Sequence, residues 1–184
     1  MSAPLCDASP PMNTQQKRIH AAFTALENIL HGMEWTFHRH QNPAGISTAY
    51  IVPAGTPVEI RTVADSIGRS LFLASHLPLE IARPRLTSFR RILERQALAL
   101  NGLTLQFRPK LGVRLVSRFW IPAEELPPER IEPWLKPCFQ DLLSQTNSLF
   151  PGLLKDALAR PKPKVKSSPL PPRLRPSDDF YLPS

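Results

Sequence analysis

The spacing of apolar residues switches between a helical and an alternating period along the chain, and this order most constrains the fold. From Ile19 to Met33, apolar residues recur every three or four positions, which predicts an amphipathic helix over about residues 14–31. Asn13 and Gln16 have the spacing of a capping box at its start, and Gly32 is expected to end it. The period then becomes alternating, which predicts strands over residues 33–38, 48–52, 58–63 and 71–77.

A second helix and a second pair of strands follow. Pro84 suits the first helical position, and the apolar stripe behind it is expected to end at Asn101 and Gly102, because glycine tolerates a left-handed backbone. Alternating runs over residues 103–107 and 113–121 predict two more strands joined by a turn.

The last periodic segment is helical but contains prolines. Residues 131–149 follow the helical period, yet Pro133 and Pro137 each lack an amide donor and clash with the preceding turn. A break or kink is therefore expected, with the main helix near residues 134–148 and a further turn or two over residues 151–159.

The order helix, strands, helix, two strands, helix predicts an α+β fold, with an antiparallel sheet of about five strands packed with helices. We expect one folded domain over residues 13–159. Residues 1–12 and 160–184 show no period, and the last 25 residues hold seven of the 22 prolines. Both ends are therefore expected to be disordered, the second as a basic proline-rich tail.

Composition and motifs argue against several classes of function. Cys6 and Cys138 are too few for a disulfide framework or a thiolate zinc site, which favours a reducing compartment. His38 and His40 have no third ligand at metal spacing. No apolar run or leader suggests a membrane or secreted protein, so a cytoplasmic protein is expected. Nucleotide-binding and nucleophile motifs do not occur, so we expect no enzyme, cofactor or metal.

Positive charge is concentrated in the middle of the chain. Of the net charge of +8, residues 60–120 contribute +8 through eleven basic and three acidic side chains, and the tail is separately basic. Alternation places four arginines on the strand faces opposite the core, with aromatic residues between them: Arg61, Arg108, Arg114 and Arg118, with Phe72, His76, Gln106 and Trp120. Arg91 and Arg95 lie one turn apart on the polar side of the second helix.

Three interpretations of this basic face remain open. It could bind an acidic protein partner, or it could bind RNA or single-stranded DNA by stacking and charge. It could also be a solvated face, or one covered by a helix or by a second copy of the chain.

The end of the tail forms a second candidate for binding. Asp178 and Asp179 are followed by Phe180, Tyr181 and Leu182, an acidic pair beside three apolar residues. We interpret this segment as a docking peptide, for a partner or for the basic face of its own domain. The alternative is that the sequence is incidental and has no binding role.

With the elements in this order, the sequence resembles the YbjN-like family over about residues 14–158. The features that carry the resemblance are Asn101 at the end of the middle helix, the Ser75–Pro78 strand end, and the step from Ile121 and Pro122 through acidic residues to Leu126 and Glu129–Ile131. The family's fold is similar to that of class I type III secretion chaperones. The resemblance implies a chaperone-like or regulatory protein-binding module, often dimeric, without a cofactor.

Overall fold

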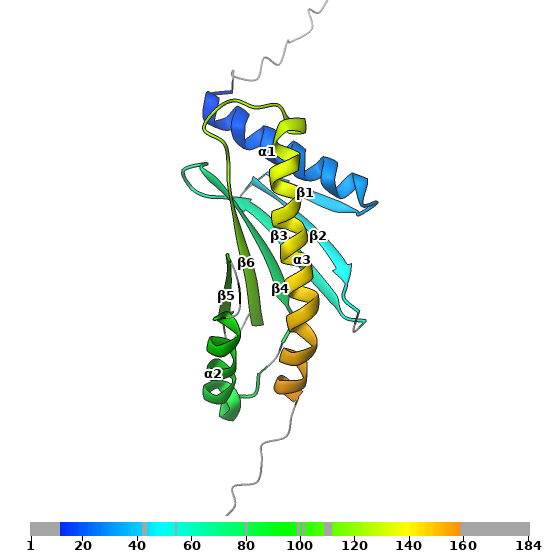
Figure 1. The fold of residues 1–184 in the computed structure, drawn as a ribbon, viewed down its shortest axis with the longest axis vertical. Helices are drawn as coiled ribbons and strands as arrows, with labels where there is room; N and C mark the ends of the chain where they lie inside the picture. The colour runs from blue at the N-terminus through cyan, green and yellow to red at the C-terminus, as the bar shows by residue number, and fades with distance from the viewer. Residues whose placement is uncertain are drawn as a thin grey trace, which may run out of the picture.

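A six-stranded antiparallel sheet forms one layer of the structure, and helices form the other (Figure 1). The computed structural model describes residues 12–41, 44–53, 55–79, 81–98, 100, 102–108 and 112–158. The elements in chain order are α1 (Thr14–Gly32), β1 (Phe37–Gln41), β2 (Ala44–Ile51), β3 (Pro57–Ala64), β4 (Ser70–Leu77), a 3-10 turn η1 (Arg83–Arg85), α2 (Leu86–Ala97), β5 (Leu103–Arg108), β6 (Gly112–Trp120) and α3 (Pro128–Leu158).

The predicted α+β fold and element order are confirmed, with six strands instead of about five. Spatial strand order is β1-β2-β3-β4-β6-β5, and every neighbouring pair is antiparallel. β4 pairs with β6, although η1, α2 and β5 lie between them in the chain. This pairing joins the first four strands and the last two in one sheet. Residues 1–12 and 160–184, which we expect to be disordered, lie almost entirely outside the described residues.

The helix starts agree with the sequence prediction, but the end of α2 does not. The Asn13 side chain accepts the Gln16 amide at 2.8 Å, and the Gln16 side chain accepts the Asn13 amide at 3.0 Å, so the predicted capping box is present. Pro84 lies in η1 and leads into α2. The helix ends at Ala97, short of the predicted end, and Leu100 instead packs on the core.

The end of α1 has a non-glycine residue in the left-handed conformation. Gly32 is the last helical residue, but the positive φ of 60° belongs to Glu34. The amide of Trp35 donates to the Leu30 carbonyl at 2.9 Å, which closes the helix. These capping bonds hold residues 33–35, so the strand that was expected from residue 33 begins only at Phe37.

The expected break in the last helix is wrong, because α3 continues through Pro133, Pro137 and Pro151. At about 100° per residue these prolines point roughly 200–240° round the helix from Ile131, opposite its buried side. All three are exposed, so the carbonyls that lose an amide partner face water, and the helix can curve with this side convex. The buried side is made by Ile131, Leu135, Phe139, Leu142, Thr146, Phe150 and Leu153.

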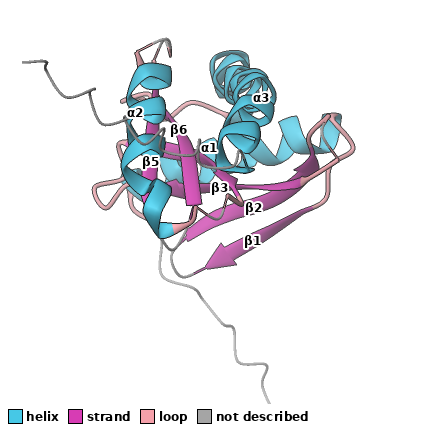
Figure 2. Cartoon of the chain, turned by 90° about the horizontal axis from the view of Figure 1, so that it is seen from below, coloured by secondary structure: helices cyan, strands magenta, loops and turns pink. Residues whose placement is uncertain are grey.

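The helices cover one face of the sheet (Figure 2). α1 and α3 pack side by side, and their apolar residues join those of β3, β4 and β6 in one core cluster. A second cluster joins Phe89 and Leu93 of α2 to Leu77, Val113 and Phe150 at one end of the sheet. The side chains on the other face of the sheet are therefore left without a helix over them among the described residues.

Candidate functional site

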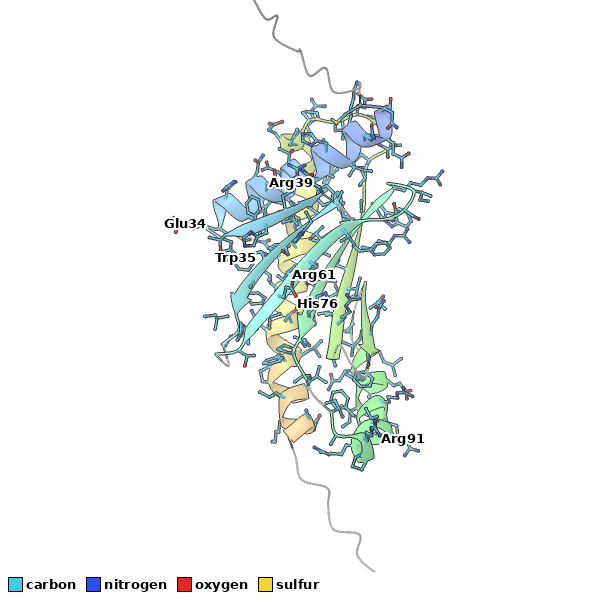
Figure 3. All side chains as sticks on the ribbon, turned by 180° about the vertical axis from the view of Figure 1, so that it is seen from behind. Glu34, Trp35, Arg39, Arg61, His76 and Arg91 are labelled. Carbon is cyan, nitrogen blue, oxygen red and sulfur yellow. The ribbon has the colours of Figure 1, made fainter. Side chains whose placement is uncertain are left out.

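The uncovered side of the sheet carries the basic and aromatic side chains that the alternation of the strands predicts. We call it the open face and define it by nine residues: Arg61, Val63, Phe72, Ala74, His76, Arg114, Val116, Arg118 and Trp120. Their neighbours in sequence, such as Ile60, Leu73 and Leu115, are buried in the core. Figure 3 views this face, with Arg61 and His76 near its middle and α3 behind the strands.

Strand pairing decides which of these side chains meet. Arg61 lies opposite Ala74, and Ala74 lies opposite Val116, so the centre of the face has short side chains. His76 lies opposite both Glu59 and Arg114, which makes a cross-strand row of charged and polar groups. Because such pairs have Cβ atoms about 4.5–5.5 Å apart, members of a row are within contact distance.

One end of the open face is organised around Arg118. Its guanidinium carbon lies 3.7 Å from the centroid of the Trp120 ring and 5.2 Å from that of Phe72. Its Nε donates to the Ser70 hydroxyl at 3.0 Å, and Nη2 lies 3.6 Å from the Asp65 carboxylate. Trp120 is nevertheless 60% exposed, so an aromatic ring is presented to solvent in a fixed orientation.

Asp65 anchors this end from the turn between β3 and β4. Its carboxylate accepts the Arg69 amide at 2.7 Å and the Ser70 hydroxyl at 2.8 Å. Burial tends to raise the pKa of Asp65, but these hydrogen bonds and the charge of Arg118 outweigh it and hold the pKa below its usual value. The carboxylate is therefore ionised at neutral pH and fixes the guanidinium of Arg118.

The other end of the open face contains a pocket of about 450 Å³. Its walls come from β3, β4 and β6, and include Pro57, Glu59, Arg61, His76, Pro78 and Arg114. Arg61 Nε contacts the Glu59 carboxylate at 2.7 Å. Among the described lining residues, two guanidinium groups stand against one carboxylate.

His76 and Arg114 are joined inside this pocket. Arg114 Nε donates to His76 Nδ1 at 3.2 Å, and since a guanidinium has no acceptor, the neutral ring carries its proton on Nε2. Nε2 is buried and has no hydrogen-bond partner among the described residues. Burial lowers the pKa of His76, and the charges of Arg114 and Arg61 lower it further, while Glu59 acts in the opposite direction.

The structure brings some predicted site residues together and separates others. Arg61, Arg114, Arg118 and Trp120 share the open face. Arg91 lies on α2, well away from Arg61 and His76 (Figure 3), and Arg95 is on the same helix. The side chain of Arg108 and the whole of residues 178–182, from Asp178 and Asp179 to Phe180, Tyr181 and Leu182, lie outside the described part of the chain.

Two carboxylates of the site, those of Glu59 and Asp65, were not predicted from the sequence to be partners of the arginines. Glu59 lies two residues from Arg61 on one strand, so alternation could have shown that both face the same way. The contact between Asp65 and Arg118 had no such signal, because it depends on β4 pairing with β6.

The described residues offer no group of three or more histidine, cysteine or acidic side chains that could hold a metal ion. His40 instead bonds the Ser47 hydroxyl at 2.8 Å. Cys138 is partly buried, and burial with the nearby Asp141 raises the pKa of its thiol. In the same part of the chain, no helix combines the length and the apolar content of a membrane span.

Comparison with known proteins shows a likeness to a solved structure. No protein-family model matches the chain, and no curated protein matches it. One chain from the structure of the HopA1–SchA chaperone–effector complex aligns with 79% of this chain and 99% of its own length, with 16% identity and a TM-score of 0.48. The chain is thus similar to a component of a chaperone–effector complex, at a distance that leaves the function to be argued from the open face.

Proposed function

We propose that this chain is a non-enzymatic protein-binding module that holds another protein or peptide on its open face. The observation that carries the proposal is the placement of all the described helices on one side of a six-stranded sheet. This placement leaves arginines and an exposed tryptophan together on the other side. Arginine and tryptophan are enriched at the centres of protein interfaces, where they contribute most of the binding energy.

The chemistry of the open face indicates the kind of partner. Arg61, Arg114 and Arg118 supply positive charge, and among the described residues the carboxylates of Glu59 and Asp65 lie next to Arg61 and Arg118. Val63, Phe72 and Val116 are only partly buried and lie between the basic groups. An extended segment with acidic and apolar residues would match both features, its charges steering the encounter and its apolar groups becoming buried.

A nucleic-acid partner is the second interpretation, and one contact argues against it. Arg118 already covers one side of the Trp120 ring, so that side is not free to stack on a base. A homodimer through this face is also disfavoured, because it would bring the arginines of two copies together.

Within this proposal, the features of the sequence favour a YbjN-like or secretion-chaperone-like role for the module, in the cytoplasm and without a cofactor. A homodimer through another surface is compatible with it.

A peptide selection tests the proposal. Random peptides displayed on phage are selected against the full chain, against the Arg61→Glu/Arg114→Glu double variant, and against an Arg91→Glu/Arg95→Glu control. The control changes the net charge equally but on α2. We expect acidic, aromatic-containing peptides that bind the full chain and the control, and at least tenfold weaker binding to the open-face variant.

Two outcomes would contradict the proposal. Selected peptides that bind all three proteins equally would show that the open face is not the binding surface. Tight binding of single-stranded RNA or DNA, lost with the open-face variant and weakening steeply with salt concentration, would favour the nucleic-acid interpretation.

A further inference from the structure

The C-terminal end of α3 lies near the pocket end of the sheet. Phe150 and Leu153, in the last turns of α3, belong to the buried cluster that contains Leu77. Leu77 also lines the pocket on the open face. The chain that follows Leu158 therefore starts at this end of the sheet, on the side that the helices cover.

The helix end at this point is held firmly. The Arg85 guanidinium donates to the carbonyl groups of Asp156 and Ala157 in the last turn of α3. A cation at a helix C-terminus is favourable, because it complements the unpaired carbonyls and the helix dipole. The position from which the last 26 residues depart is thus fixed relative to the pocket.

The length of the following chain is sufficient to pass round the end of the sheet. Nineteen residues, 159–177, separate α3 from Asp178. As a random coil they would span about 25 Å, and as an extended polyproline chain about 60 Å. Packed layers of secondary structure lie roughly 10 Å apart, both for two sheets and for two helices, so either length of chain is enough to reach the open face.

The charges of the tail favour its last residues as the occupant. Asp178 and Asp179 are the only acidic residues after Asp156, whereas residues 160–177 carry six basic ones. The linking part of the tail would be repelled by the arginines of the open face, and the acidic end would be attracted.

The spacing of the segment also fits the face. In an extended chain Asp178, Phe180 and Leu182 point to one side, and Asp179 and Tyr181 to the other. Asp178 and Leu182 would be about 13 Å apart, the same as the distance along β6 between Arg114 and Arg118, since each pair is four residues apart.

We propose that residues 178–182 bind the open face of their own chain and occupy it until a partner displaces them. Asp178 enters the pocket at Arg61 and Arg114, because the tail arrives at that end first. Phe180 and Leu182 cover the apolar side chains of Val116 and Phe72. The inference rests on the proposed function in treating the open face as a peptide-binding surface, and it adds competition by the chain's own end.

Nuclear magnetic resonance of the full chain and of a chain ending at Pro176 tests the inference. If the tail is bound, backbone amide signals of residues 72–76 and 114–118 differ between the two proteins, and those of α2 do not. In the full chain, the Asp178→Asn/Phe180→Ser variant should show the open-face signals of the shortened chain. The Asp179→Asn/Tyr181→Ser variant, with equal changes on the other side of the segment, should keep the open-face signals of the full chain. Identical open-face signals in the full and shortened chains would overturn the inference.

A second measurement separates this inference from the proposed function. A peptide from the selection above is titrated into the full and the shortened chain. We expect at least threefold tighter binding to the shortened chain, since the competitor is gone. Equal affinity, still sensitive to Arg61→Glu, would refute the tail contact and leave the function intact. Tail-dependent spectra without any peptide that needs the open face would refute the function and leave the tail contact standing.

Discussion

Arg118 lies over the indole ring of Trp120, with its guanidinium carbon 3.7 Å from the ring centroid. The two residues are two positions apart on β6, so they point to the same side of the sheet. The Asp65 carboxylate and the Ser70 hydroxyl hold Arg118 from the neighbouring turn and strand. An exposed ring and a charged group are thereby held in one arrangement before any partner arrives.

Removing this arginine should affect the site more than the fold. Arg118→Ala is expected to lower the free energy of unfolding by only about 1 kcal/mol, since an exposed cation–π contact contributes about 0.5–1 kcal/mol. The pKa of Asp65 should rise toward its usual value, because the charge that helps to lower it is lost. Urea denaturation and a carboxyl titration by nuclear magnetic resonance measure the two effects. An unchanged pKa would contradict the contact.

Leu93→Asp should unfold the domain, whereas Arg91→Glu should not. Leu93 is 6% exposed and packs in the cluster of α2 with the end of the sheet, while Arg91 is exposed on the same helix. A buried carboxylate without a partner costs several kcal/mol. Thermal denaturation followed by circular dichroism distinguishes the variants, and similar melting temperatures would mean that the helix faces are wrongly assigned.

Residues 13–159 should form a domain that folds by itself. The buried clusters of the described structure all lie between Ala22 and Leu153, so deleting residues 160–184 removes none of these side chains. We expect a single cooperative transition in the calorimeter, with nearly the same midpoint as the full chain. A loss of cooperativity would assign the tail a structural role.

Glu34→Gly should stabilise the protein by about 0.5–1 kcal/mol, because a residue with a side chain is strained at positive φ and glycine is not. Glu34 has a φ of 60° and is exposed, so its side chain contributes little packing. Gly68→Ala is the matched opposite case. Its φ is also 60°, and a Cβ there would lie 2.5 Å from the Gln15 side chain, so we expect destabilisation. Urea midpoints that move in the same direction would contradict this account.

The stability of the fold should fall as the pH drops below neutral, in part because of His76. The folded state lowers the pKa of His76 from 6.5, so below that pH the unfolded chain binds more protons than the folded one. Stability is therefore lost as the pH falls from about 7 toward the folded-state pKa. His76→Gln removes this contribution, and its unfolding free energy should change less between pH 7 and 5. An equally steep decline in the variant would show that other groups cause it.

Local features of the fold could be read from the sequence. The capping box of α1, the apolar stripe of α2 and the alternation of β5 and β6 depend on residues within a few positions of each other. For the same reason, alternation correctly placed Arg114 and Arg118 on the side of β6 opposite Leu115. The positive φ of Glu34 was not predicted, because glutamate is an uncommon residue in that conformation.

The helical and strand periods, and with them the side chains that face the core, followed from the order of the residues alone. The unbroken course of α3 through three prolines became evident only in the folded chain, because the solvent side of a helix can be recognised only once its buried side has a partner. The place of β4 between β3 and β6 likewise depends on contacts between distant segments. Glu59, His76 and Arg114 come from these three strands, and they meet because backbone pairing between distant segments sets the register.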